Sequence, residues 1–154
     1  MNKQDIAILE LLQTDAMGSV ADIADQVGIS KSACWRRIKK LEDDGIIGAK
    51  VTLLDQTKIG LSLTAYISVK TNQHNDEWAV GFKSVLMDMP NVLEVHRTSG
   101  DCDYLIKAVV ENMSGYDRLY KQLIKADIFD VSSSFVMETI KYTTKLPLDE
   151  LHNR

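Results

Sequence analysis

The sequence predicts an α+β protein in which three short helices precede a β-α-β-β-α-β unit. Apolar side chains recur at helical spacing over residues 5–44, and Gly28 interrupts them where a sharp turn is expected. From residue 61 onward, strand-like and helix-like segments follow one another in the order β-α-β and then β-α-β again. We therefore expect two small domains, 1–60 and 61–154.

The composition excludes several classes of protein. The apolar share is 45% and the formal net charge is -4, which is ordinary for a globular chain. No apolar run approaches the roughly 18 residues that a membrane span needs, and the N-terminus lacks the features of a signal peptide. Cys34 and Cys102 lie far apart, and neither the cysteines nor the histidines match a metal-site spacing. We expect a cytoplasmic protein with reduced thiols, no metal and no membrane partner.

Three helices are predicted in the N-terminal domain. Each begins near a residue whose side-chain oxygen can accept a hydrogen bond from the free N–H groups of the first turn. The predicted helices cover residues 5–15, 19–27 and 30–44, with caps at Asp5, at Ser19 or the residues beside it, and at Ser30.

The spacing between the second and third helices is typical of a helix-turn-helix. Gly28 can adopt the left-handed conformation that ends one helix and turns the chain sharply. Ala24 stands four residues earlier, where two crossing helices leave room for only a small side chain. The helix after the turn is basic, as in DNA-binding proteins of this type.

Positive charge gathers on the third helix although the chain is acidic overall. Five Lys and Arg residues fall within residues 30–40, with no acid among them. Cys34, Ile38 and Leu41 form a stripe that is expected to be buried, so the charged faces point outward. A charge run is also typical of a solvated surface, but next to a glycine turn of this spacing it favours DNA binding.

We expect the DNA contacts to come from residues 30–40. Side chains in the first half of the helix are expected at base edges, and the lysines further along are expected at phosphates. Arg37 borders the buried stripe, so it is expected either to pack or to pair with an acid. The candidate DNA-binding residues are Ser30, Lys31, Ser32, Trp35, Arg36, Arg37, Lys39 and Lys40.

The segment between the domains is predicted to be a wing or a tether. Val51, Thr52 and Leu53 favour a short connecting strand, because β-branched and apolar residues favour extended structure. Turn residues flank it on both sides.

The second domain is predicted to be ferredoxin-like. The stretch "LSLTAYISVK" alternates as a half-buried strand, and the segments "NVLEVHRTS", "DYLIKAVV" and "DVSSSFVMETIKYT" are the other expected strands. This order gives four antiparallel strands with both helices on one face. The last strand has apolar residues on both faces, so a second copy of the sheet is expected to cover the open face, giving a homodimer.

The loop between the second and third strands of this domain is the candidate site for a small ligand. Gly100 permits a tight turn, and Asp101 and Asp103 can accept hydrogen bonds from an ammonium group. A plain β-hairpin turn explains the same residue types. The candidate effector-binding residues are Thr98, Ser99, Gly100, Asp101, Cys102, Asp103, Tyr104, Ser133 and Ser134.

Taken together, the motifs resemble the Lrp/AsnC family of amino-acid-responsive transcription regulators. The resemblance rests on "DIAILELLQTD", "IADQVGIS", "RRIKKLEDDGII", "KVTLLDQTKIGL", "SGDCDYL" and "SSSF", and it covers essentially the whole chain. It implies a winged helix-turn-helix followed by a sensing domain, an amino acid bound between dimers near the glycine-aspartate loop, and dimers that assemble into octamers or similar discs, associated with the nucleoid. The tail "SSSFVMETIKYTTKLPL" is similar to a branch with cysteine-responsive members, and Cys102 departs from the family's usual loop residue.

Two other functions remain open from the sequence. One is a non-specific DNA-organising protein of the same fold, which differs only in its specificity ratio. The other is a small ferredoxin-like enzyme, for which Cys102 and His96 are the available pair, although no motif orients them.

Overall fold

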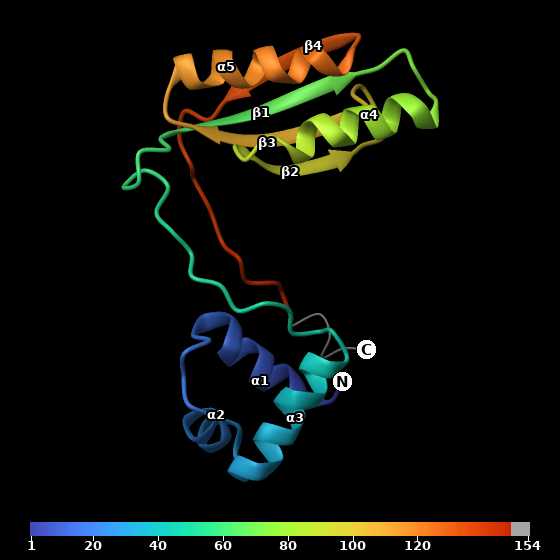
Figure 1. The fold of residues 1–154 in the computed structure, drawn as a ribbon. Coiled ribbons are helices and arrows are strands. Elements are labelled where there is room, and N and C mark those ends of the chain that lie inside the picture. The colour runs from blue at the N-terminus through green and yellow to red at the C-terminus, as the bar shows by residue number, and fades with distance from the viewer. Residues whose placement is uncertain (149–154) are drawn as a thin grey trace. The chain divides into compact units, whose positions relative to one another are not determined.

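The computed structural model describes residues 1–148 and consists of two compact units (Figure 1). The first unit contains Met1–Thr52 together with the segment that starts at Lys141, and the second contains Leu53–Ile140. The sequence predicts a single boundary near residue 60. The C-terminal segment joins the first unit because Leu148 packs against its apolar core.

The first unit is built from three helices, as the sequence predicts. They are α1 (Lys3–Thr14), α2 (Val20–Val27) and α3 (Lys31–Asp43). Their N-caps are Asn2, Ser19 and Ser30, and each side chain accepts a hydrogen bond from a backbone N–H of the first turn. The cap expected at Asp5 is wrong: Asp5 lies one turn inside α1 and completes a capping box with Asn2.

A small apolar core holds the three helices together. It consists of Ile8, Leu9, Ile23, Ala24, Cys34, Ile38 and Leu41. The predicted stripe on α3 is therefore buried, and Cys34 is completely inaccessible. Gly28 has φ 72°, the left-handed conformation that the turn between α2 and α3 requires.

The strand predicted around residues 51–53 is not formed. Residues 49–62 contain turns and irregular backbone, and among the described residues all strands lie between Leu63 and Phe135. A strand needs a neighbouring strand to take up its N–H and C=O groups, and no segment of the described chain pairs with this one. Val51, Leu53 and Leu54 are consequently exposed.

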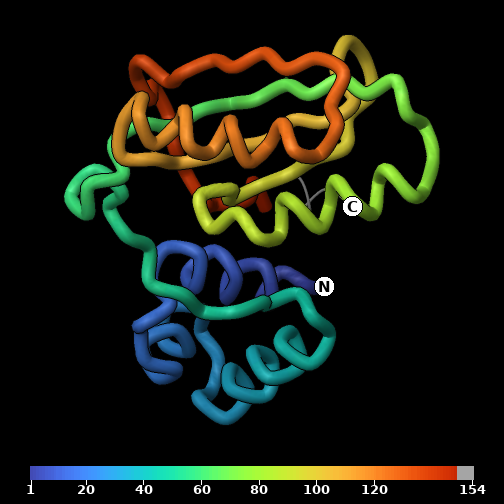
Figure 2. The backbone as a smooth tube through the Cα atoms, turned by 45° about the horizontal axis from the view of Figure 1, so that its top comes forward, coloured from blue at the N-terminus to red at the C-terminus, as the bar shows by residue number. Residues whose placement is uncertain are grey.

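The second unit is the ferredoxin-like domain that the sequence predicts. Its elements are β1 (Leu63–Lys70), α4 (Asp76–Met87), β2 (Val92–Arg97), β3 (Tyr104–Val110), α5 (Met113–Leu123), η1 (Ile124–Ala126) and β4 (Asp130–Phe135). The strands form one antiparallel sheet in the order β2-β3-β1-β4. Figure 2 shows α4 and α5 on the same face of this sheet.

The core of this unit lies between the sheet and the two helices. Ala65, Ile67 and Val69 on β1 alternate with outward-facing residues, so the predicted half-buried strand is confirmed. Trp78 and Phe82 lie one turn apart on α4, and their rings stack with 4.9 Å between the centroids. Both residues are buried in the core of this unit.

The last strand is shorter than predicted. It ends at Phe135, which pairs with Ala65, and one further backbone bond joins Val136 to Thr64. Beyond that point Met137 and Ile140 are almost fully exposed, since no neighbouring strand continues alongside them. Within residues 1–148, none of the helices has the length and apolar character needed to cross a membrane.

Candidate nucleic-acid interface and effector site

The first half of α3 presents side chains that have no partner in the described part of the chain. Among residues 1–148, Lys31, Trp35 and Arg36 make no side-chain hydrogen bond or ion pair. Trp35 is 57% exposed, so its ring lies on the outer surface of α3 beside these basic groups. Basic groups beside an exposed aromatic ring on one rigid helix can meet phosphates and base edges together.

The second half of α3 is neutralised by acids. Lys39 lies 2.9 Å from Asp43, and Lys40 lies 2.6 Å from Asp44, each one turn further along the helix. The hydrogen bond to Asp43 and its negative charge raise the pKa of Lys39, and Asp44 raises the pKa of Lys40 in the same way. Both lysines stay charged and exposed, so a DNA phosphate can replace the aspartate as partner.

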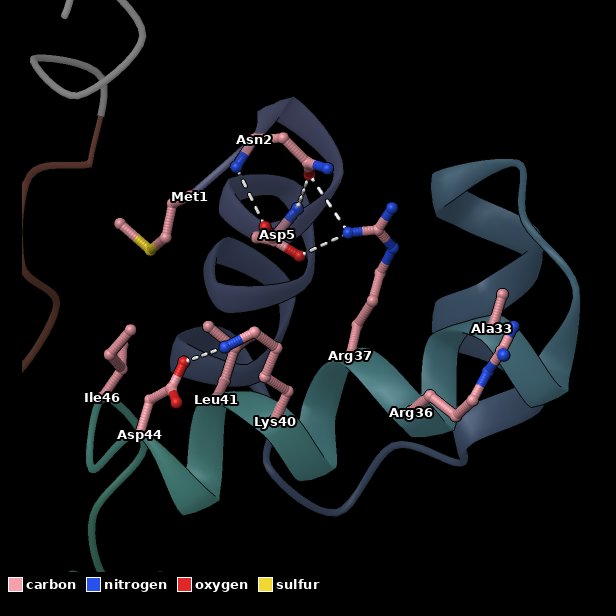
Figure 3. Close-up of a pocket in the computed structure, with 10 residues that line it drawn as sticks. All are labelled: Met1, Asn2, Asp5, Ala33, Arg36, Arg37, Lys40, Leu41, Asp44 and Ile46. Atoms are coloured by element: carbon pink, nitrogen blue, oxygen red, sulfur yellow. Dashed lines mark hydrogen bonds and ion pairs between the residues drawn. The ribbon is translucent and has the colours of Figure 1, made fainter.

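Arg37 points to α1 instead of to solvent. Figure 3 shows its guanidinium reaching the N-terminus of α1, whereas Arg36 lies back along α3. The two arginines border a cavity of about 560 Å³ at the junction of the two helices. Of the two outcomes expected for Arg37, packing or pairing with an acid, the structure shows pairing, with Asp5 at 2.7 Å.

The hydroxyl groups of two predicted DNA-binding serines, Ser30 and Ser32, already make hydrogen bonds within the chain. The Ser30 hydroxyl accepts a hydrogen bond from the Ala33 N–H, which caps α3. The Ser32 hydroxyl lies 3.3 Å from the Ser30 hydroxyl and remains exposed. Ser32 therefore keeps a free face at the start of the helix.

The candidate effector loop, residues 98–104, joins β2 to β3, and some of its polar groups hold the loop in shape. The Thr98 hydroxyl donates to the Cys102 carbonyl at 2.7 Å. The Asp103 carboxylate accepts a hydrogen bond from the Thr71 N–H at 2.8 Å, which ties the loop to the end of β1. Gly100 has φ 114°, a backbone conformation that residues with a side chain rarely adopt.

Other groups of the loop remain available. Ser99 and Asp101 are exposed and make no side-chain bond within residues 1–148. Cys102 is half-buried, and its sulfur lies 3.5 Å from the Thr98 hydroxyl. A carboxylate at the tip of a rigid loop is a suitable acceptor for the ammonium group of an amino acid.

The predicted serines of the last strand do not meet the loop within one chain. They lie on β4, which is separated from β3 by β1. Ser133 faces the helices and shares a hydrogen bond with the Tyr116 hydroxyl, while Ser134 points to the opposite face of the sheet.

A small cavity of about 110 Å³ lies beside the loop, and Asp103 and Tyr104 are the candidate effector residues that line it. Asp103 and Tyr104 contribute one wall, and Arg97 and His74 contribute others. The rest of the lining comes mainly from the polar run that begins at Thr71, and in the sequence such a run is typical of an ordinary connection between a strand and a helix. In residues 1–148 no cluster of three His, Cys, Asp or Glu side chains could hold a metal ion.

Comparison with known proteins identifies both regions. Residues 1–47 match the family model of a winged helix-turn-helix DNA-binding domain, and residues 64–146 match the Lrp/AsnC ligand binding domain. The chain is 46% identical over 151 residues to the DNA-binding transcriptional activator DecR of Escherichia coli, with 97% of this chain and 99% of that protein covered. It is 44% identical over 151 residues to the glutamate uptake regulatory protein of Zymomonas mobilis, with 97% and 92% covered.

Solved structures agree with this result. An AsnC family transcriptional regulator from Agrobacterium tumefaciens superposes with a TM-score of 0.93 at 47% identity, covering 98% of this chain and 99% of that one. A transcriptional regulator from Neisseria meningitidis in complex with L-methionine gives 0.92 at 32% identity, with the same coverage. These relatives are regulators and not enzymes, which excludes the Cys102–His96 alternative. The chain belongs to the Lrp/AsnC family of amino-acid-responsive, DNA-binding transcriptional regulators.

Proposed function

We propose that α3 lies in the major groove of promoter DNA and reads it with the first half of the helix. The observation that carries this proposal is the set of unpartnered side chains Lys31, Trp35 and Arg36 on one rigid, outward-facing surface. Ser32, Trp35 and Arg36 are assigned to base edges, where one well-placed arginine contributes about 1–3 kcal/mol of discrimination.

Phosphate contacts are assigned to Lys39 and Lys40, which flank the groove-facing surface. Their aspartate partners are exposed, so exchanging them for phosphates costs little. The other candidate residues are Ser30, whose hydroxyl caps the helix, and Arg37, whose guanidinium pairs with Asp5.

We infer that the effector is a small amino acid held by the loop at residues 98–104. The Asp101 carboxylate would accept the ammonium group, and the backbone beside Gly100 would approach the ligand closely because no Cβ blocks it. A ligand of this size needs to be enclosed on most of its surface, and within residues 1–148 the tip of this loop is exposed.

A second copy of the chain would complete the site. The exposed apolar residues of the two segments that flank the sensing domain support self-association, because such surfaces are rarely left open to water. They are Val51, Leu53, Leu54, Ile59, Met137 and Ile140. We propose a homodimer that assembles into an octamer or similar disc, with the effector between dimers.

Cysteine is the first effector to examine. Cys102 replaces the usual residue of the loop, and the tail from Ser132 is similar to that of cysteine-responsive members. The Neisseria relative was solved with L-methionine, another sulfur-containing amino acid. A regulator of this kind works where the DNA is, so we assign it to the cytoplasm in association with the nucleoid.

The first experiment measures the melting temperature of the full chain against each of the twenty amino acids. A ligand present at a hundred times its dissociation constant adds about 2.7 kcal/mol to the free energy of unfolding, which shifts the melting temperature by several degrees. Asp101→Asn should abolish the shift, and Asp88→Asn, at an exposed position after α4, should keep it. If Asp101→Asn responds like the wild type, the loop assignment is wrong.

A further inference from the structure

We propose that Arg37 is a positioning residue: by binding the N-terminus of α1 it sets the orientation of α3, and it does not itself contact DNA. The sequence places Arg37 within the basic run of α3, where it resembles its neighbours. This inference rests on the proposed docking of α3 in the groove, and the experiment below separates the two.

The guanidinium of Arg37 reaches three residues at the N-terminal end of α1, one of them the N-cap. One nitrogen donates to the Asp5 carboxylate at 2.7 Å and to the Asn2 amide oxygen at 3.3 Å. The second terminal nitrogen donates to the Gln4 side-chain oxygen at 2.7 Å. These residues are 32 to 35 positions away in sequence, so the contact joins two separate helices.

The partners of Arg37 are themselves held in place. The second carboxylate oxygen of Asp5 accepts the Asn2 N–H at 2.9 Å, and the Asn2 amide oxygen accepts the Asp5 N–H at 3.0 Å. The α1 cap and the α3 arginine therefore form a single network (Figure 3). Hydrogen bonds between charged groups in fixed geometry are among the stronger ones in proteins.

The network is shielded from water more than the rest of the basic surface. The side chain of Arg37 is 30% exposed and that of Asp5 is 17% exposed, compared with 74% for Lys40. Partial burial of Asp5 opposes its ionisation, but the hydrogen bond from Asn2 and the nearby Arg37 outweigh it and lower the pKa of Asp5. If Arg37 bound a DNA phosphate instead, the Asp5 carboxylate would lose its ion-pair partner and lie close to the negative charge of the DNA, which is unfavourable.

The orientation of α3 matters for the neighbouring side chains. Successive residues are about 100° apart around a helix, so directing Arg37 toward α1 directs Arg36 and Trp35 elsewhere. A roll of about 20° around the helix axis would displace the tip of an arginine by about 3 Å, which is enough to break a base contact. Loss of the network should therefore reduce selective binding more than general attraction to DNA.

The experiment uses the full chain and a duplex that the wild-type protein selects from a random-sequence pool. Dissociation constants are measured for this duplex and for an unselected one, over a series of salt concentrations. The variants are Arg37→Met, Asp5→Asn, the double variant, and the matched controls Arg36→Met and Lys39→Met. Asn at position 5 keeps an oxygen that can accept the Asn2 N–H, and circular dichroism confirms that each variant is folded.

We expect Arg37→Met and Asp5→Asn each to weaken binding to the selected duplex about 10-fold, and the double variant to be no weaker than either. The slope of log Kd against log salt should stay at the wild-type value, and binding to the unselected duplex should change less than 3-fold. Lys39→Met should lower the slope by about one.

The opposite result would overturn the inference. If Asp5→Asn tightens binding and Arg37→Met lowers the salt slope by about one, Arg37 contacts a phosphate that Asp5 competes for. If both variants leave the dissociation constants unchanged, the network does not position α3. If Arg36→Met and Lys39→Met also change nothing, the proposed docking of α3 is wrong.

Discussion

On α3 the side chains of Lys31, Trp35 and Arg36 extend outward and have no hydrogen-bond or ion-pair partner in the described chain. The loop at residues 98–104 differs, because the side chains of Thr98 and Asp103 are hydrogen-bonded to nearby backbone groups. The first surface is ready to bind within one chain. The second has its shape, but few of its polar groups are free, and within residues 1–148 the tip of the loop is exposed at Ser99, Gly100 and Asp101.

The difference follows from the size of the two ligands. DNA is large and rigid, so a convex helix with outward charges can bind it without being enclosed. A small amino acid gains enough affinity only where most of its surface is buried. A single chain can therefore present a DNA-binding surface, whereas we expect an amino-acid site at this loop to be completed by a second chain.

The largest expected effect tests whether the two sites belong to separate units. Ile8 is completely buried in the first core and Ile106 in the second. Replacing either with Ala should destabilise its own unit by about 2–5 kcal/mol, because the cavity cannot fully collapse. Ile8→Ala should abolish DNA binding and leave the thermal response to the effector intact, and Ile106→Ala should do the reverse. If one substitution removes both activities, the sites are not separable.

A smaller effect tests whether the shape of the loop matters. Gly100→Ala forces a side chain into φ 114° and should cost about 1–3 kcal/mol and weaken the effector response. Gly81 is the matched control, because it is an exposed residue within α4 with open space around it. Gly81→Ala should stabilise the domain by about 0.5–1 kcal/mol. Urea unfolding measures both, and equal effects would exclude a special role for the loop glycine.

The C-terminal segment gives a still smaller prediction, confined to the DNA-binding unit. Leu148 packs against the first core, and Leu148→Ala should lower the stability of that unit by about 1–2 kcal/mol. Leu146 is 70% exposed, and its two hydrogen bonds to the Gln13 side chain are made by the backbone N–H and C=O of Leu146. Leu146→Ala keeps these bonds and should have little effect. A matching loss in both variants would mean that Leu148 does not contribute to this core.

The smallest expected effect concerns pH and the network between α1 and α3. Folding lowers the pKa of Asp5, so ionised Asp5 stabilises the folded state at pH values above the unfolded pKa of about 3.9. This stabilisation is lost as the pH falls through the pKa that Asp5 has in the folded state. The difference in the free energy of unfolding between wild type and Asp5→Asn should shrink below about pH 4. A constant difference from pH 6 to pH 3 would contradict the pairing with Arg37.

Local patterns in the sequence determined most of the secondary structure. The polar caps of α2 and α3, the left-handed glycine between them and the alternation along β1 each depend on residues within about four positions. The order of strands and helices then leaves few ways to build the sheet, so the ferredoxin-like fold was predictable. The exposed basic surface of α3 follows from the same helical spacing.

Only the tertiary structure decided which polar groups pair across long separations. Arg37 finds Asp5 on α1, Gln13 holds Leu146 from the far end of the chain, and Ser133 turns to Tyr116 and away from the loop. The strand predicted near residue 51 does not form, because a strand depends on a neighbour that local sequence does not specify. The sequence by itself determined the helices, the strands and the charged face of α3; packing decided which of those charges remain free to bind.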